Sequence, residues 1–354
     1  MKFEPEDFIV EEIPLYEPSR SGIHTFFAIR KRSLTTYDAI NRIARELHVN
    51  HRSIGYAGLK DKHAITTQVL SVERIPPEQI LKLKVPQIQI LWAERHSHKL
   101  RVGHLQANRF EITLRYASPQ TLPDVEKKMA QLSTEGVPNR YGEQRFGNKQ
   151  DSHLIGKALL NKDWERALGY VLDTETAQFT ELAKQTKDIR KQDSLEKAVA
   201  CIPHRKRRLY LSAYQAYLFN RILEKRLPDL GKLLDGDIAI KHRNGAPFLV
   251  ENAEIEQPRA DTFEISPSGP IFGYKMRQPD GKVLEMEQEL LSAEGVKPES
   301  FRKVAGVRLS GTRRPLRIQM DLHQVKAIDN RVRLSFTLPA GSYATVVLEE
   351  LRYC

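Results

Sequence analysis

Strand patterns near both ends of this 354-residue chain enclose a middle part that is patterned mainly for helices. Residue patterns predict four strands: His24 to Arg30, Arg109 to Tyr116, Leu316 to Met320 and Arg331 to Leu338. Between them, helical periodicity dominates from about Gly136 to about Leu227, where Pro228 stops it. This order predicts a sheet domain interrupted by an insertion, although the sequence alone does not show that the two ends pair.

Local signals predict three helices and one turn in the interior of the chain, and a short helix near its C-terminal end. The predicted helices are Tyr37 to Leu47 with Thr35 or Thr36 as its cap, Asp124 to Leu132 behind Pro123, and Ser212 to Arg226 with Ser212 as its cap. The segment SPSGP, Ser266 to Pro270, predicts a turn because proline, glycine and serine favour turns. Gly341 and Ser342 open a short terminal helix that contains Val346, Val347 and Leu351.

The charge of the chain points to a polyanionic partner. Lysine and arginine number 56 against 45 acidic residues, which gives a net charge of +11 and a pI near 9.5. Basic side chains that replace counterions on phosphates gain binding free energy from the released ions. The only cysteines, Cys201 and Cys354, form neither a disulfide framework nor a zinc site, and no apolar run is long enough for a signal peptide or membrane span. We therefore expect a soluble cytoplasmic protein.

The segment Gly55 to Gln68, GYAGLKDKHAITTQ, places one acid in an unusual setting. Asp61 stands between two lysines, on a loop shaped by Gly55 and Gly58 that leads into the β-branched strand Ile65 to Val72. In most proteins a Lys-Asp-Lys triplet is simply solvated charge on the surface. Here the glycine-shaped loop and the adjacent cations, which favour the ionised carboxylate, indicate a nucleophile or a general base.

Two long segments of the chain resemble the TruD-type tRNA pseudouridine synthases. Gly58 to Thr66 matches the family signature G-x-K-D-x-x-A-x-T, and Gly136 to Gly147 matches G-V-P-N-Y-F-G-x-Q-R-F-G. Weaker collinear matches lie at Pro5 to Phe8, at Asn108 with Phe110, at Leu211 to Asn220, at Asp235 to Asp237 and at Leu338 to Ser342. Two long motifs in order, with five supporting ones, make a chance match very unusual.

The resemblance implies an α+β fold: a mixed, mainly antiparallel sheet core of the pseudouridine synthase type with helices packed on it, plus an inserted α/β domain. Residues 1–135 together with 313–354 would form the discontinuous catalytic domain, and residues 136–312 the insertion. The implied enzyme is an isomerase that converts uridine to pseudouridine in tRNA, at position 13 in the D-arm, without cofactor or metal. We expect a monomer with tRNA as its partner and no protein partner.

The resemblance also assigns roles to individual residues. It implies Asp61 as the catalytic residue, Lys2 as its basic partner, and Phe8, Asn108, Phe110 and Tyr343 as substrate contacts. Stacking holds a detached base while it turns, whereas an asparagine amide offers both a donor and an acceptor to uracil. Core packing is the competing explanation for Phe110, and a turn for Asn108. The chain departs from the family at Arg140, Tyr141 and Tyr343, each of which replaces an aromatic residue.

Basic residues are the candidates for phosphate contacts. They are Lys60, Lys62, Arg205, Lys206, Arg207, Arg208, Arg313 and Arg314. A solvated charged face is the alternative for such runs. His96 and His98, or His63 near Asp61, lack further ligands at a recognisable metal-site spacing, so no metal site is predicted.

Two other functions stay open at the level of sequence. A non-catalytic RNA-binding or RNA-remodelling protein on the same scaffold would have the same charge. A metal-dependent nuclease would lose its cleavage activity with a chelator. The sequence also leaves open whether Asp61 adds to C1′ or C6 or removes a ribose proton.

Overall fold

The computed structural model describes residues 4–115, 122–174 and 192–351. The chain divides into two compact units, the first made of Met1–Thr134 with Gln319–Cys354 and the second of Glu135–Ile318. The second unit ends after β11 (Thr312–Pro315) and β12 (Arg317–Ile318), a few residues beyond the expected end of the insertion. Each unit is described by itself below.

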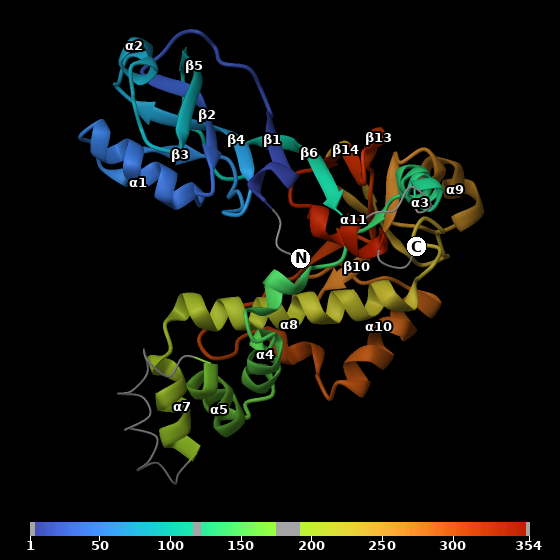
Figure 1. The fold of residues 1–354 in the computed structure, drawn as a ribbon. Coiled ribbons are helices and arrows are strands. Elements are labelled where there is room, and N and C mark those ends of the chain that lie inside the picture. The colour runs from blue at the N-terminus through green and yellow to red at the C-terminus, as the bar shows by residue number, and fades with distance from the viewer. Residues whose placement is uncertain (1–3, 116–121, 175–191, 352–354) are drawn as a thin grey trace. The chain divides into compact units, whose positions relative to one another are not determined.

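An eight-stranded sheet forms the first unit, in the order β13-β14-β6-β1-β4-β2-β5, with the short β3 paired to β4 (Figure 1). Its strands are β1 (Phe8–Pro14), β2 (His24–Arg32), β3 (Gly55–Tyr56), β4 (Ile65–Glu73), β5 (Ile88–His96), β6 (Leu105–Arg115), β13 (Asp321–Ile328) and β14 (Arg331–Pro339). β1 and β4 run parallel and the other neighbours antiparallel. The expected mixed, mainly antiparallel sheet is confirmed.

The two ends of the chain meet in this sheet. β14, near the C-terminus, pairs with β6 along its whole length, from Arg331 opposite Arg115 to Pro339 opposite Ala107. The sequence predicted both strands but not their pairing. The Tyr116 end of the predicted strand lies outside the described residues.

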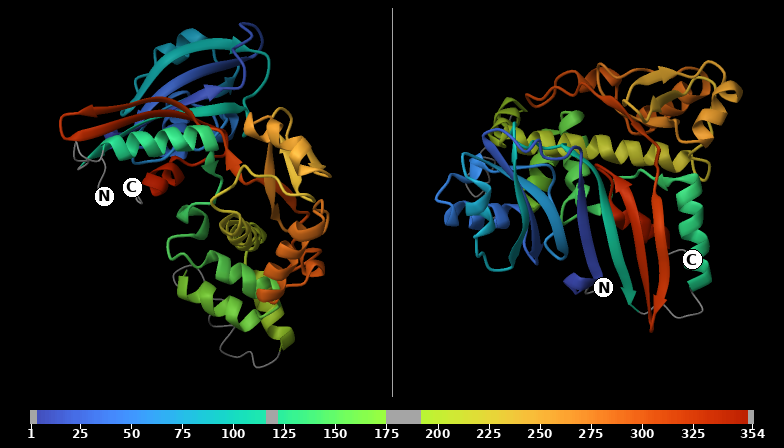
Figure 2. Two further views of the ribbon diagram at one scale, coloured as in Figure 1. Left: turned by 90° about the vertical axis from the view of Figure 1, so that its right-hand side faces the viewer. Right: turned by 90° about the horizontal axis from the view of Figure 1, so that it is seen from above.

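Helices cover parts of the sheet. α1 (Thr36–Glu46) begins at Thr35, whose hydroxyl accepts the Asp38 N–H in a capping box, as expected. Its residues Ala39, Ile40 and Ile43 are buried with Phe27 and Ile29 of β2. α3 (Leu122–Glu135) buries the expected Val125, Met129 and Leu132 and lies beside the β13–β14 hairpin in both views of Figure 2. The short α2 (Pro77–Leu81) and α11 (Ala344–Glu350) complete the unit.

A long helix organises the second unit. α8 (His204–Lys225) packs against α4 (Ser152–Leu160), α10 (Gly281–Ala293) and β10 (Ile265–Ile271), as Figure 1 shows. Other elements of the unit are α5 (Trp164–Thr174), α7 (Gln192–Cys201), α9 (Ala253–Asp261), β7 (Val137–Pro138), β8 (Ile238–Lys241) and β9 (Pro247–Leu249). A four-stranded sheet has the order β11-β10-β8-β9, and β7 pairs with β12.

Three local predictions were wrong. Ser212 is not a cap: it lies inside α8, which starts eight residues earlier, and its hydroxyl donates to the Leu209 carbonyl. Ser266–Pro270 is not a turn but most of β10, a buried strand. β8 pairs only with residues 265–267 and β11 only with 268–271, so the two prolines fit into a strand that changes partners midway. The strand expected over Leu316 to Met320 shrinks to the two residues of β12.

Candidate active site

One face of the large sheet, called the site face below, carries most of the expected substrate contacts. A single row of paired residues crosses it: Phe336, Phe110, Val10, Thr66 and Lys31 on neighbouring strands. Directly paired residues point their side chains to the same side of a sheet. Phe8 and Asn108 lie on this side too, since each is two residues along a strand from a member of the row. The structure thus brings Phe8, Asn108 and Phe110 together.

Asp61 lies on the loop that enters β4, beside this face, and its side chain is exposed. The buried ammonium of Lys31 is hydrogen-bonded to the main chain of this loop. Its Nζ donates to the Asp61 carbonyl oxygen at 3.0 Å and to the Leu34 carbonyl oxygen at 2.5 Å. The main chain of Asp61 is therefore tied to the sheet while its carboxylate remains accessible.

The neighbouring residue Lys60 fastens the other side of the loop. Its Nζ forms a buried ion pair with Glu12 Oε2 at 2.6 Å, and its N–H donates to Thr36 Oγ1 at 2.9 Å. The second oxygen of Glu12 accepts the Val69 N–H at 3.2 Å. Lys60 was expected to contact phosphate, but its charge is used inside the fold, and we withdraw it from the proposed RNA contacts. Lys62 is exposed and remains available.

Lys31 is one of the residues that sequence reasoning missed. It has no exposed surface, and burial lowers its pKa to about 8, although the nearby Asp61 charge opposes this shift. The signal was present in the sequence: Phe27, Ile29 and Lys31 alternate in one strand, so they share its buried face. A lysine at the end of such a series is a candidate for a buried functional role.

The aromatic residues form a small cluster on the site face. Phe110 is only 6% exposed, with its ring centroid 6.1 Å from that of Phe8, edge to face, and 5.5 Å from that of Phe336, stacked. Phe8 is half-buried and offers more surface. Phe110 therefore supports the cluster from within, whereas Phe8 is better placed to touch a base.

Three buried polar atoms on this face have no hydrogen-bond partner among the described residues: Asn108 Oδ1, Gln68 Nε2 and Thr66 Oγ1. A buried polar atom without a partner costs free energy, on the order of 1–3 kcal/mol, unless a water or ligand satisfies it. Both donors and acceptors are represented, as the edge of a uracil requires.

The remaining expected residues lie in different places. Tyr343, 40% exposed, precedes α11 and follows the end of β14 where Leu338 pairs with Asn108. Lys2 lies outside the described residues. Of the basic run at the start of α8, Arg205 and Arg208 are exposed, whereas Arg207 donates to the carbonyl oxygens of Ile202 and Ala305. Lys206 is half-buried.

Two expected phosphate contacts are instead built into the second unit. Arg313 is buried, with Nη1 2.8 Å and 3.1 Å from the two carboxylate oxygens of Glu287. Arg314 lies over the Tyr141 ring at 4.4 Å and donates to the main-chain and side-chain oxygens of Asn139. We therefore leave both out of the proposed RNA contacts.

Among the described residues, no three histidine, cysteine, aspartate or glutamate side chains are arranged to hold a metal ion. Nor does any helix in those parts of the chain have the length and apolar character needed to cross a membrane.

Comparison with known proteins decides the family. The family model for tRNA pseudouridine synthase D (TruD) matches residues 1–193 and 171–351. A relative named tRNA pseudouridine synthase D, from Geobacter metallireducens, is 42% identical over 98% of this chain and 93% of its own. The chain belongs to the TruD family.

Other members agree with this assignment. The TruD relative from Geobacter sulfurreducens is 40% identical over 98% of this chain and 92% of its own length. A Methanosarcina mazei crystal structure assigned to TruD superposes with a TM-score of 0.79 and 26% identity, covering 100% of this chain and 93% of that one. The resemblance that the motifs indicated is confirmed, and the α+β fold with it.

The two TruD signature segments have clear structural positions. Gly58–Thr66 forms the loop over the site face and the start of β4, with Asp61 at its exposed part. Gly136–Gly147 forms β7 and the 3-10 helix Glu143–Phe146 in the second unit. Gly136 has a φ of +96°, and a Cβ there would lie 2.9 Å from the Phe263 ring, so this signature glycine is required by conformation and by space.

Proposed function

We propose that this chain converts uridine to pseudouridine in tRNA, with position 13 of the D-arm as target and Asp61 as nucleophile or general base. The observation that carries the proposal is the Asp61 loop: its main chain is fixed by Lys31 and Lys60, and its carboxylate is exposed beside the site face. Membership of a family of enzymes named for this reaction supports the same conclusion.

The reaction needs few protein groups. The bond from ribose C1′ to uracil N1 breaks, a bond from C1′ to C5 forms, the hydrogen on C5 leaves as a proton and N1 gains one. Atoms and electrons balance without a redox partner. Asp61 starts the reaction by adding to C1′ or C6, or by removing a ribose proton.

The other residues of the site face hold the base while it turns. The target uridine first leaves its stack, which costs a few kcal/mol. Phe8, supported by Phe110, then offers a stacking surface, and the exposed Tyr343 beyond the end of β14 offers another, each worth roughly 1–3 kcal/mol per base. The unpartnered Asn108 Oδ1, on a half-buried side chain, accepts from the uracil edge. Stacking and edge contacts together offset the cost of extrusion.

The deciding experiment replaces Asp61 with asparagine, which keeps shape and removes the charge. We expect pseudouridine at position 13 to fall at least about a thousandfold while the Kd for tRNA stays within about threefold, since the carboxylate acts in the transition state rather than in binding. The substrate is tRNA from cells that lack the activity, and pseudouridine is mapped at single-nucleotide resolution.

A matched control is Asp329→Asn. Asp329 is exposed in the β13–β14 turn with a φ of +52°, a conformation that asparagine adopts readily. It should leave both measurements unchanged. If the wild-type protein binds tRNA but makes no pseudouridine, the enzyme function is refuted and the non-catalytic RNA-binding function is favoured. Pseudouridine at another position would overturn the D-arm assignment alone, and activity unaffected by EDTA would exclude the metal-dependent nuclease.

A further inference from the structure

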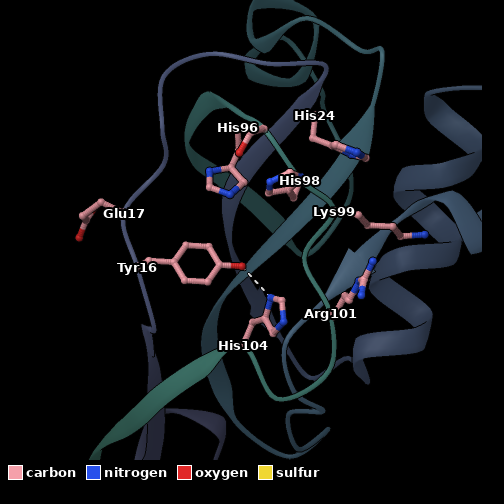
Figure 3. A pocket seen from close by; sticks show the side chains of 9 residues that line it. Tyr16, Glu17, His24, His96, His98, Lys99, Arg101 and His104 are labelled. Carbon is pink, nitrogen blue, oxygen red and sulfur yellow. Dashed lines mark hydrogen bonds between the residues drawn. The ribbon is translucent and has the colours of Figure 1, made fainter.

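A concave site separate from the site face lies in the first unit, at the end of β2 that is far from Lys31. We call it the histidine pocket; it has a volume of about 740 Å³ and is lined by Tyr16, four histidines, Lys99 and Arg101 among others (Figure 3). His24 and His96 face each other across β2 and β5, seven residues of strand away from Lys31. At about 3.3 Å per residue, this separates the two ends of β2 by about 23 Å.

The pocket connects to the Asp61 loop through the main chain. The Gly103 N–H, one residue before the pocket residue His104, donates to the Ala57 carbonyl oxygen at 2.8 Å. Ala57 lies four residues before Asp61, so their Cα atoms are at most about 14 Å apart. His24 and Lys31 are an odd number of residues apart in β2, so the pocket lies on the face of the sheet opposite the site face. An RNA that contacts both must pass around the Asp61 loop.

Aromatic rings form one wall of the pocket. Tyr16 stacks on His96, with ring centroids 5.4 Å apart and planes at 15°, and meets His104 edge to face at 5.7 Å. The Tyr16 hydroxyl and His104 Nδ1 share a hydrogen bond of 2.6 Å, drawn dashed in Figure 3. His96 Nδ1 accepts the Ser19 N–H at 3.0 Å, which places the ring proton on Nε2. These bonds fix the rings in place as stacking surfaces before any ligand arrives.

Lys99 and Arg101 carry positive charge in the pocket, whereas His24 and His96 do not. Burial lowers the pKa of both His24 and His96; for His24 the Glu73 charge opposes this shift, and Lys99 and His98 add to it. Both imidazoles are therefore neutral at pH 7. Arg101 is exposed, and Lys99 uses one bond, to the Arg52 carbonyl oxygen at 2.7 Å. The one acid of the lining, Glu17, is exposed and points away from the rings in Figure 3.

This combination restricts the ligand. An apolar molecule would cover Arg101 and Lys99 with a surface that cannot bond them and would leave His24 Nδ1 without a partner. The histidines do not converge as metal ligands within the described residues. Aromatic faces, ring N–H donors and adjacent cations suit a planar base joined to a phosphate. His24 Nδ1, buried and without a partner in the described chain, adds a polar atom at the pocket lining.

We propose that the histidine pocket binds an unpaired nucleotide of the RNA substrate, with its base against the rings of Tyr16 and His98 and its phosphate at Lys99 and Arg101. The identity of the ligand rests on the proposed function, because it names RNA. The pocket would extend recognition beyond the target uridine, holding a flanking part of the tRNA while the site face holds the reacting base.

The first test uses two exposed pocket residues, whose replacement leaves the fold intact. Arg101→Glu and His98→Ala should each raise the KM and the Kd for tRNA about tenfold and leave kcat within about twofold, since they act on binding and not on the reacting atoms. The matched control is Arg331→Glu, the same charge change at an exposed position of β14, toward the other edge of the sheet. A KM and Kd for both pocket variants equal to those of the control would overturn the proposal.

The second test needs no catalysis. Uridine 5′-monophosphate and inorganic phosphate are titrated separately into full-length protein with labelled histidine, and the imidazole signals are followed by NMR. We expect the nucleotide to shift the His98 and His104 signals at a concentration at least about tenfold below that of phosphate, and Arg101→Glu to weaken the effect. No shift with the nucleotide, or equal binding of phosphate alone, would overturn nucleotide recognition.

The two tests separate this proposal from the proposed function. If the protein makes no pseudouridine but binds the nucleotide in a way that depends on Arg101, the proposed reaction is refuted and nucleotide binding by the histidine pocket is supported. If the enzyme is active and its pocket variants bind tRNA as the control does, the proposed reaction is supported and nucleotide binding by the histidine pocket is refuted.

Discussion

Lys31 gives the candidate site its rigidity at the scale of a single residue. An exposed lysine could not do this, because its ammonium would exchange main-chain acceptors for water. Here the amine has no exposed surface and bonds the carbonyl oxygens of Leu34 and Asp61. Positioning a reacting group within a fraction of an ångström is a large part of catalysis, and a displacement of 1 Å can cost a hundredfold in rate.

Replacing Lys31 with methionine should separate positioning from stability. The thioether fits the space of the stem but leaves both carbonyl oxygens without their donor, so the Asp61 loop loosens. We expect kcat to fall about 10- to 100-fold with little change in KM for tRNA, measured under saturating and limiting substrate. The exposed Lys84→Met serves as control. A rise in KM with an unchanged kcat would show that Lys31 supports binding rather than the geometry of Asp61.

The same lysine makes stability depend on pH. Its pKa in the folded protein is about 8, against 10.5 for the unperturbed group. Between these values the unfolded chain binds a proton that the folded chain has released, so the free energy of unfolding rises with pH. Between pH 7 and pH 10.5, the free energy of unfolding of the wild type should rise by up to about 3 kcal/mol more than that of Lys31→Met. Urea denaturation at several pH values measures the free energy of unfolding of both proteins. A wild-type minus variant difference that does not change with pH would contradict this prediction.

At the scale of elements, one arginine organises the second TruD signature segment. Arg314 of β11 covers the Tyr141 ring and bonds both oxygens of Asn139, while Asn220 of α8 bonds the Tyr141 main chain at both its N–H and its carbonyl oxygen. The segment is thereby attached to a strand and to the long helix of the same unit. Its polar residues act within the fold, which motif matching alone could not reveal.

Arg314→Lys tests this attachment. Lysine keeps the charge but loses the planar group that stacks and donates two bonds at once. We expect the free energy of unfolding to fall by about 1–3 kcal/mol in chemical denaturation. Arg308→Lys, an exposed arginine of the same unit, should change it by less than about 0.5 kcal/mol. Equal effects of the two substitutions would show that Arg314 is not a structural residue.

The elements also show where sequence reasoning succeeds. Periodicity was sufficient for α1 and α3, because their buried residues repeat with helical spacing, and α1 also has a local cap at Thr35. β10 was missed because its stability comes from two partner strands far away in the sequence, which its own prolines and serines do not reveal. The motif singled out Asp61, whose catalytic role stays a prediction. Lys31 and the ion pair of Lys60 with Glu12 depend on tertiary contacts and were not found.

At the scale of the whole molecule, the chain leaves the large sheet after α3 and returns to it at β13. The ends of the second unit are joined to each other, since Val137 of β7 pairs with Ile318 of β12. The ends left in the first unit are also close: Ser133 Oγ donates to the Met320 carbonyl oxygen at 3.0 Å. Each unit has its own buried core. Both features are what an inserted domain requires.

We therefore expect residues 135–318 to fold alone. A core that includes Leu159, Trp164, Tyr214 and Phe301 is fully internal to this segment, and its first and last strands close the unit. Conversely, a chain in which a short glycine-serine linker replaces residues 135–318 should keep the sheet, because the linker joins adjacent ends and a short loop costs little closure entropy. Cooperative thermal unfolding followed by circular dichroism tests both products.

The activity of these two products distinguishes a structural insertion from a functional one. If tRNA needs both units, neither product alone should form pseudouridine. Each should bind tRNA more weakly than the full chain, because the basic residues that we propose as phosphate contacts are divided between them. A linker-joined first unit that retained full kcat and KM would show that the second unit is dispensable for the reaction. Non-cooperative unfolding of residues 135–318 would instead show that its core depends on the first unit, and that the two are one folding domain.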